Sequence, residues 1–334
     1  RRPRAGGPDL ATLEGLFRSQ RGLAETVGEW AFYAAAVLLV LALVKRFPYR
    51  WFAKTHTVLA ALYLGLVFHS VILLQFSYWL QPVGLLMASL MAVGSICAVL
   101  VLTGRVGSRR KVRGQVVAVQ SYPASHVLET RIELQPGWAG HQAGQFAFVT
   151  FDQREGAHPF TIASAWSPQT RQLTFITKAL GDHTAAMPGL VEAGLPVTVE
   201  GPYGCFNFED QQASQIWVGG GIGITPFIAR LKQLAQQGGA DKPIDLFHAA
   251  AVYESAAIDQ LKADAQAAGV RLHLFHDATN GRLDADKIRA LVPGWKASSI
   301  WFCGPSGFGA SLWQNFKSHG LPQAAFHREL FEMR

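Results

Sequence analysis

The chain has 334 residues, of which 49% are hydrophobic and 16% are charged, against roughly 25% charged in an ordinary soluble domain. This composition excludes a disordered or coiled-coil protein and indicates that part of the chain avoids water. Three isolated cysteines, Cys97, Cys205 and Cys303, exclude a C-x-x-C zinc site, a cysteine-ligated iron–sulfur cluster and a disulfide scaffold.

Three apolar runs in the first third of the chain predict membrane-spanning helices at residues 28–44, 55–79 and 82–104. Their lengths lie near the roughly 17 to 25 residues that cross a bilayer. Residues 1–27 are charged and contain no such run, and the chain starts at Arg1 rather than Met. We therefore expect the sequence to begin partway through a longer protein.

Basic residues flank these runs. Lys45 and Arg46 open a short basic loop after the first run, and five basic residues between Arg105 and Arg113 follow the third. This distribution is typical of membrane topology, with basic segments in the cytosol, and it argues against nucleic acid as the partner of a chain with net charge +7. We expect a multi-pass protein of the cell membrane, with the lipid bilayer as a partner and everything after residue 104 in the cytosol.

The rest of the chain predicts two further domains. Short β-rich runs bounded by Gly and Pro indicate a small antiparallel β-barrel at residues 105–212. From residue 213 to 334, strand-like runs alternate with helical stretches, which indicates an α/β domain with a parallel sheet. The expected fold class is therefore an α-helical transmembrane bundle fragment, then the barrel, then the α/β domain.

A glycine-rich turn lies at the start of the third domain, in the run IWVGGGIGITPF. A strand that leads through glycines into a Thr-Pro helix start lets the backbone approach a pyrophosphate at the positive end of the helix. Such a turn can also form without a ligand, so the neighbouring motifs are needed to decide whether it binds a nucleotide. The residues expected at this site are Gly219, Gly220, Gly221, Gly223, Thr225 and Pro226.

Three other motifs accompany this turn: HPFTIAS at residues 158–164, EGPYG at residues 200–204, and CGP at residues 303–305. In this order and spacing they resemble the ferredoxin–NADP reductase superfamily. The HPFT run is similar to that of its membrane branch, the NADPH oxidases and ferric reductases. The resemblance implies an FAD-binding barrel, an NAD(P)H-binding α/β domain and b-type heme in the membrane.

Residue by residue, the resemblance implies that His158 lies near the flavin phosphate or ribityl chain, that Phe160 packs on the isoalloxazine, and that Thr161 lies near its N5. An aromatic face and a small hydroxyl suit a flavin that receives hydride. Pro159 and Ser164 belong to the same contact. Lys178, Gly181 and Thr184 resemble the family's pyrophosphate segment.

The glycine-rich turn would hold the NAD(P)H pyrophosphate, and Thr225 with Cys303, Gly304 and Pro305 would lie close to the nicotinamide. Phe331 resembles the terminal aromatic residue that covers the flavin, with Phe326 as the competing choice. Thr161, Cys303 and Phe331 are the expected catalytic residues.

The segment after the second parallel strand departs from the family pattern. Ala249, Ala250 and Ala251 stand where NADPH users often carry an arginine for the 2′-phosphate. Without that bidentate partner a phosphate loses charge-assisted hydrogen bonds. We therefore expect the chain to use NADH or to discriminate only weakly between NADH and NADPH.

His56 and His69 in the second apolar run are the expected heme ligands. They lie 13 residues apart, about 20 Å along a helix, and about 140° apart around it. Ionisable groups inside spans are usually functional. The resemblance places their partner histidines on earlier helices, so helices missing from this chain would be needed to complete the heme sites.

The resemblance implies electron transfer from cytosolic NAD(P)H through FAD and heme b to an external acceptor, dioxygen or ferric iron. Two alternatives stay open. One is a membrane-anchored flavin reductase that serves a cytosolic acceptor without heme, and the other is a non-catalytic membrane sensor that binds flavin or nicotinamide.

Overall fold

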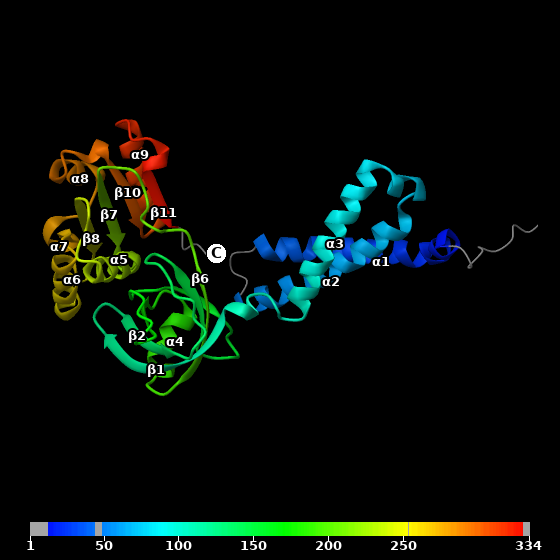
Figure 1. Cartoon of the computed structure of the whole chain (residues 1–334), viewed down its shortest axis with the longest axis horizontal. Helices are drawn as coiled ribbons and strands as arrows, with labels where there is room; N and C mark the ends of the chain where they lie inside the picture. The colour runs from blue at the N-terminus through cyan, green and yellow to red at the C-terminus, as the bar shows by residue number, and fades with distance from the viewer. Residues whose placement is uncertain (1–12, 44–48, 253, 330–334) are drawn as a thin grey trace, which may run out of the picture. The chain divides into compact units, whose positions relative to one another are not determined.

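The computed structural model describes residues 13–43, 49–252 and 254–329. The chain divides into two compact units, a helical unit that ends at Ser108 and a mixed α/β unit that starts at Arg109 (Figure 1). Secondary structure in the second unit runs from β1 to β11.

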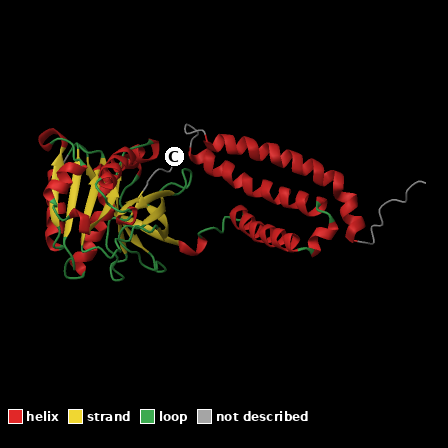
Figure 2. Cartoon of the chain, turned by 90° about the horizontal axis from the view of Figure 1, so that it is seen from above, coloured by secondary structure: helices red, strands yellow, loops and turns green. Residues whose placement is uncertain are grey.

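The helical unit contains three long helices, α1 (Leu13–Leu43), α2 (Tyr49–Leu73) and α3 (Pro82–Leu102). Small residues let them approach closely: Gly65 of α2 faces Val27 of α1, and Gly94 of α3 faces Tyr63 of α2. α2 therefore packs against both other helices, which Figure 2 shows running alongside one another.

The helix bounds differ from those expected. α1 begins 15 residues before the predicted start at 28, because the preceding segment is also helical and carries an ion pair between Arg21 and Glu25 (3.0 Å). The helix predicted to end at 79 stops at Leu73, since Gln75 adopts an extended conformation (φ −61°, ψ 133°) ahead of a short 3₁₀ helix, η1 (Phe76–Leu80).

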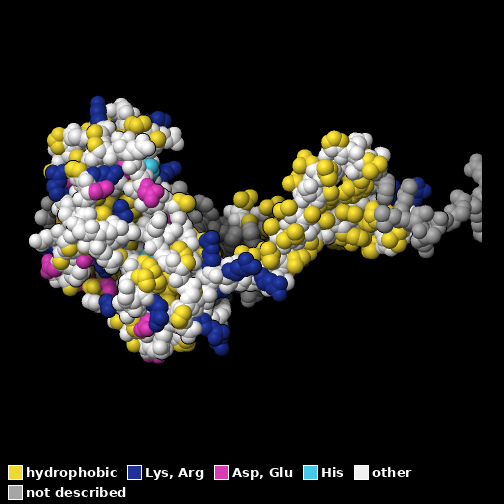
Figure 3. All heavy atoms as spheres, in the orientation of Figure 1, with side chains coloured by type: hydrophobic (Ala, Val, Ile, Leu, Met, Phe, Trp, Pro, Cys, Tyr) yellow, Lys and Arg dark blue, Asp and Glu magenta, His cyan; other side chains and the backbone are white. Residues whose placement is uncertain are grey.

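Two helical segments among the described residues are long and apolar enough to cross a bilayer: Gly15–Leu43 and Pro82–Leu102. The apolar part of α2, Thr57–Leu73, is shorter than such a span. Large hydrophobic side chains along α1 and α3 are exposed, and Figure 3 shows them gathered over the helical unit. Contiguous apolar surface of this kind marks a lipid or protein contact.

The second unit opens with an antiparallel barrel, as predicted. Its sheet has the order β4-β3-β6-β1-β2-β5, and a bridge between Ile162 and Phe175 joins the two outer strands. One helix, α4 (Asp182–Leu190), lies between β5 and β6 in the chain. The strands are β1 (Lys111–Tyr122), β2 (Val127–Leu134), β3 (Phe146–Thr150), β4 (His158–Thr161), β5 (Gln172–Lys178) and β6 (Pro196–Tyr203).

A five-stranded parallel sheet follows, in the order β11-β10-β7-β8-β9, also as predicted. Trp217 and Trp301 pack into one buried cluster, whereas Phe302 packs into another, so alternating residues of the strands serve two cores. The strands are β7 (Ser214–Gly220), β8 (Ile244–Ala250), β9 (Arg271–His276), β10 (Ser298–Cys303) and β11 (Phe326–Glu329). The helices are α5 (Thr225–Gln236), α6 (Ser255–Ala267), α7 (Asp277–Asn280), α8 (Ala285–Leu291) and α9 (Ser306–Ser318), with helices on both sides of the sheet (Figure 2).

Asp210 anchors the segment that connects the two sheets. Its carboxylate accepts hydrogen bonds from Ser299 Oγ (2.6 Å) and Gln215 Nε2 (2.6 Å), and pairs with Lys242 Nζ (3.0 Å). Burial alone would raise the pKa of Asp210, but these donors outweigh it and hold the pKa at about 2. The connecting segment is thereby tied to three strands or strand ends of the parallel sheet.

Candidate functional site

A cavity of about 590 Å³ lies where residues of the barrel and of the parallel domain meet. The barrel contributes β4, β5 and the start of α4, and the parallel domain contributes the glycine-rich turn and the end of β10. The lining residues are Pro159, Phe160, Thr161, Ile176, Thr177, Lys178, Leu180, Thr184, Gly220, Gly221, Ile222, Gly223, Thr225, Pro226, Cys303, Gly304, Pro305 and Ser306. Thirteen of the residues singled out from the sequence therefore line one space.

Strand β4 brings an aromatic ring and a hydroxyl to this cavity. The ring of Phe160 is held edge-on by the buried rings of Phe151 (6.1 Å between centroids) and Phe175 (6.3 Å). Thr161 follows directly at the end of the strand and is half-buried. Ring packing in the barrel core thus fixes the position of β4, and the end of the strand lines the cavity.

The glycine-rich turn connects β7 to α5. Gly221 has φ +56°, and a side chain added there would meet nothing within 4 Å, so its backbone faces open space. At Gly223 an added Cβ would overlap the carbonyl of Cys303, so this glycine lets two turns touch. The Thr225 hydroxyl donates to the Ile222 carbonyl (2.8 Å), which closes the turn.

The end of β10 carries a buried thiol. Cys303 is 1% exposed, and burial together with the nearby Glu329 carboxylate raises the pKa of its thiol far above the usual range. The thiol therefore stays neutral and is no nucleophile at physiological pH. Its side chain packs in the buried cluster that also contains Trp301.

Glu329 was not singled out from the sequence. The register of β10 and β11 sets it opposite Cys303, burial raises the pKa of its carboxyl to about 8, and its Oε2 is buried without a hydrogen-bond partner among the described residues. A carboxyl group that is protonated near neutral pH, next to a residue that lines the cavity, is a candidate for proton transfer. Only the pairing of β11 with β10, which no sequence motif encodes, could have identified Glu329.

The segment between β5 and α4 is shaped by Thr184. Its hydroxyl accepts hydrogen bonds from the N–H groups of Leu180 (3.0 Å) and Gly181 (3.1 Å). Lys178 and Thr184 line the cavity, whereas Gly181 is the N-cap of α4 and does not. A positive side chain and a helix start lie together here, an arrangement that favours an anion.

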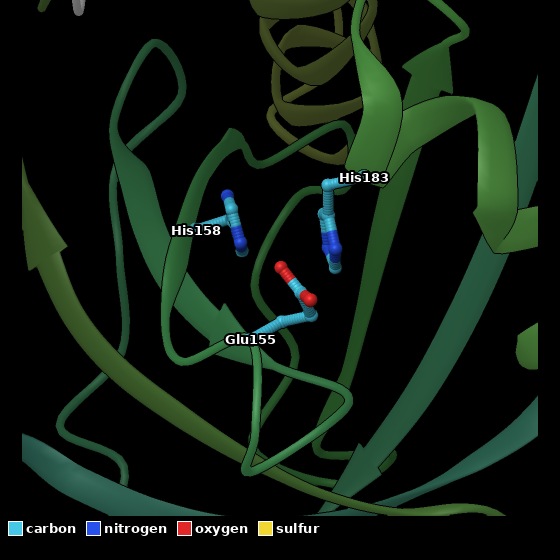
Figure 4. Close-up of side chains that lie close together, drawn as sticks. All are labelled: Glu155, His158 and His183. Carbon is cyan, nitrogen blue, oxygen red and sulfur yellow. The ribbon is translucent and has the colours of Figure 1, made fainter. Parts of the chain in front are cut away.

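Other residues named from the sequence lie outside the lining. The ring of His158 stacks on His183 (3.7 Å between centroids, 8° between planes; Figure 4). Ser164 Oγ accepts a hydrogen bond from the N–H of Thr174 (3.1 Å), and Gly219 packs inside the turn against Ile224. Phe331 lies outside the described residues.

A second cavity, of about 240 Å³, shares Ile176, Lys178, Gly221 and Ile222 with the first. It runs from the glycine-rich turn past the end of β8 and includes Ala250 and Ala251. The glycine-rich turn therefore lines both cavities.

An acidic side chain stands in the second cavity. Glu254 Oε1 accepts a hydrogen bond from the N–H of Ala124 in the barrel (2.8 Å), which fixes its position. The cavity also contains Lys232, so charges of both signs line it.

In the helical unit, His69 faces α1. Its Nδ1 donates a hydrogen bond to the carbonyl of Ala24 (2.8 Å), and its ring lies so close to Gly28 that any Cβ there would overlap it. Such a bond fixes the tautomer that leaves Nε2 as the acceptor, as in many metal-ligating histidines. His56 lies in α2, but its side chain is outside the described residues.

Comparisons with known proteins agree with this geometry. Residues 111–207 match the family model described as an FAD-binding domain. The NADPH oxidoreductase of Mycobacterium tuberculosis is 28% identical over 213 residues, which are 60% of this chain and 55% of that protein. The heavy chain of the superoxide-generating NADPH oxidase from Dictyostelium discoideum is 24% identical over 343 residues, or 90% of this chain and 63% of that protein.

Among solved structures, the FAD/NAD-binding domain of nitric oxide dioxygenase from Vibrio cholerae has the same fold. It covers 66% of this chain and 98% of its own chain, with a TM-score of 0.57 and 18% identity. The chain spans little more than half the length of the first curated relatives that it matches. These relatives are NAD(P)H-dependent flavin oxidoreductases, which confirms that class for this chain.

Proposed function

Starting from an FAD-binding domain of the ferredoxin–NADP reductase superfamily at residues 111–207, we propose that this chain is the reductase part of a membrane electron-transfer protein. It takes electrons from NAD(P)H in the cytosol and passes them through heme b to an external acceptor. The observation that carries the proposal is the single cavity in which Phe160 and Thr161 meet the glycine-rich turn and Cys303.

The cavity fits a flavin. It is large, it is lined mostly by apolar groups, and β4 supplies the aromatic ring that an isoalloxazine packs against. Lys178 and the start of α4 supply positive potential for the diphosphate. When bound, FAD accepts two electrons as hydride and releases them singly, which heme requires.

The residues of the chain would then orient the flavin and the coenzyme and shield them from water. Phe160 excludes water from one side of the cavity, and the hydroxyl of Thr161 can donate a hydrogen bond to an acceptor beside it. Gly221 and Gly223 let the backbone N–H groups of the turn approach the coenzyme pyrophosphate. Glu329 can hold a proton next to Cys303 at neutral pH, because burial keeps its carboxyl protonated.

The second cavity favours NADH over NADPH. Ala250 and Ala251 stand where an arginine would meet a 2′-phosphate, and Glu254 places a carboxylate in the same cavity, which Lys232 also lines. A carboxylate can bind a ribose 2′-hydroxyl but repels a phosphate. We expect Glu254→Gln to narrow the preference for NADH about tenfold, measured as the ratio of the two kcat/KM values. A variant in which the ratio stays unchanged would contradict this assignment.

His69 supports the heme part of the proposal. Its Nδ1–H is fixed on Ala24, so its Nε2 would be the iron ligand. Membrane association rests on the two long apolar segments Gly15–Leu43 and Pro82–Leu102, and on the exposed apolar side chains of α1 and α3. The likeness to the Dictyostelium oxidase, which extends over 90% of this chain, favours dioxygen as the acceptor over ferric iron.

The experiment that tests the proposal is an absorption spectrum of the detergent-purified full-length protein before and after anaerobic NADH, with His69→Ala alongside. We expect flavin bleaching followed by reduced low-spin heme bands, and we expect those bands to be lost or altered in His69→Ala. Flavin that bleaches in a protein with no heme bands would instead favour a membrane-anchored reductase.

A further inference from the structure

The hairpin between β1 and β2 lines the second cavity. Tyr122 ends β1, Val127 opens β2, and a tight turn joins them. Tyr122, Ser125 and His126 of this hairpin lie in the lining of the cavity together with Glu254, the N-cap residue of α6. The barrel domain therefore forms one wall of a cavity whose other walls come from the parallel domain.

Two hydrogen bonds fix the hairpin in this place. The N–H of Ala124 donates to Glu254 Oε1 (2.8 Å), which ties the turn to the parallel domain. The N–H of Ala179 donates to the carbonyl of His126 (3.0 Å), which ties the turn to the end of β5. His126 has φ +53°, a conformation that is uncommon outside glycine and that persists where surrounding contacts hold it. The hairpin is therefore a positioned wall of the cavity.

Tyr122 brings a half-buried phenol ring to this wall. Burial raises the pKa of its hydroxyl, and the nearby carboxylates of Glu129 and Glu254 raise it further, so the phenol is neutral at physiological pH. Ile228 of α5 and Ile258 of α6 line the same space. A neutral aromatic ring in a largely apolar slot suits the flat face of a heterocyclic base, which stacks on such rings.

The position of the glycine-rich turn indicates which base this is. Gly221 and Ile222 line both cavities, and the pyrophosphate of a dinucleotide lies between its two halves. If the turn holds the pyrophosphate and the first cavity holds the nicotinamide, the second cavity receives the adenosine. This step rests on the proposed function.

We propose that the β1–β2 hairpin, through the ring of Tyr122, binds the adenine end of the coenzyme. The barrel that carries Thr161 then contacts both ends of the dinucleotide. Binding energy from the distant adenosine would thereby help to orient the nicotinamide, since contacts with remote parts of a substrate can be used at the reacting centre. Tyr122 is a positioning residue in this account, because it does not touch the reacting atoms.

The test compares NADH with reduced nicotinamide mononucleotide, which lacks the adenosine. Anaerobic stopped-flow measurements on the detergent-purified, FAD-loaded chain give a second-order rate constant of flavin bleaching for each. We expect the ratio of the NADH constant to the mononucleotide constant to fall about fivefold or more in Tyr122→Leu. Tyr122→Phe, which keeps the ring, should retain the wild-type ratio. Ser121→Ala, at an exposed neighbouring position outside the lining, should retain it as well.

Competition by adenosine monophosphate gives a second readout that does not depend on the variants being well folded. We expect it to compete with NADH in the wild type, and to compete about fivefold more weakly in Tyr122→Leu. An unchanged ratio in Tyr122→Leu, or no competition in a wild type that NADH bleaches, would overturn this inference alone. A wild type that neither nucleotide bleaches would overturn the proposed function and this inference with it.

Discussion

The pKa of Glu329 depends on strand register and could not be predicted from the sequence alone. In an unfolded chain this carboxyl has a pKa near 4.5, and burial opposite Cys303 raises it to about 8. The folded protein therefore holds one more proton than the unfolded chain between these two pH values. Its free energy of unfolding must fall as the pH rises from about 4.5 to about 8.

Glu329→Gln should remove this part of the pH dependence. The amide cannot ionise, so we expect the Tm of the variant to decline less than that of the wild type between pH 4.5 and pH 8. The difference in unfolding free energy at the upper end should be on the order of a few kcal/mol. Parallel pH series of thermal unfolding measure it, and Glu192→Gln, at an exposed position, serves as the control. Identical slopes in Glu329→Gln and wild type would mean that Glu329 is ionised in the folded protein.

At the scale of elements, Asp210 joins the connecting segment to the parallel sheet. Asp210→Asn removes the charge and turns an amide toward donors from Ser299 and Lys242. We expect a loss of about 3 kcal/mol, because buried donors lose a charged acceptor. For a unit of this size this lowers the Tm by about 6 to 12 °C.

The fluorescence of the tryptophans can follow this change, since Trp301 Nε1 lies 3.2 Å from the Asp210 carboxylate. Asp259→Asn on exposed helix α6 removes an equal charge and should leave the Tm within about 2 °C of wild type. A Tm equally unaffected in Asp210→Asn would show that the network does not hold the segment.

The contact between α1 and α2 depends on Gly28. An added methyl group would overlap the ring of His69, so Gly28→Ala should displace that ring and break its bond to Ala24. Gly22→Ala is the matched control, since a Cβ there meets nothing within 4 Å and alanine favours the helix. We expect Gly28→Ala, but not Gly22→Ala, to lower the thermal stability of the helical unit and to change any heme spectrum. Two variants that behave alike would exclude this close contact.

How far the sequence predicts the elements depends on whether the signal is local. Alternating and buried runs identified several strands of each sheet, because residues such as Trp217 and Phe302 carry the pattern themselves. The end of α2 was missed, because the break at Gln75 is conformational and leaves the apolar composition unchanged. The start of α1 was missed because charged helical turns resemble a loop in hydropathy.

For the candidate site, sequence motifs predicted residues that are contiguous in the chain. They did not predict residues that only the fold brings together. Phe160, Thr161 and the glycine-rich turn were predicted because each belongs to a short run. Glu329 and His183 come to their positions through strand pairing and the packing of α4, which no local spacing encodes. The stacking of His158 on His183 was unforeseen for the same reason.

At the scale of the whole molecule, the exposed apolar side chains of α1 and α3 predict that the chain associates with a membrane. Exposed side chains such as Leu85, Val93 and Ile96 would be costly in water. We expect the chain to stay with the membrane fraction after washes in high salt and alkali, and to be released by detergent. Release by salt alone would indicate a peripheral contact through basic residues and would remove the membrane-spanning interpretation.

On this proposal one cavity holds a flavin that a nicotinamide coenzyme reduces. The most direct test is anaerobic stopped-flow mixing of the FAD-loaded chain with NADH or NADPH, following the flavin absorbance, for the wild type and for Gly223→Ala. In this variant an added Cβ would overlap the Cys303 carbonyl and part the two turns. We predict rapid bleaching by NADH in the wild type and slowing by at least tenfold in Gly223→Ala, with flavin still bound. A wild-type chain that binds FAD but is not bleached by either coenzyme would contradict the account.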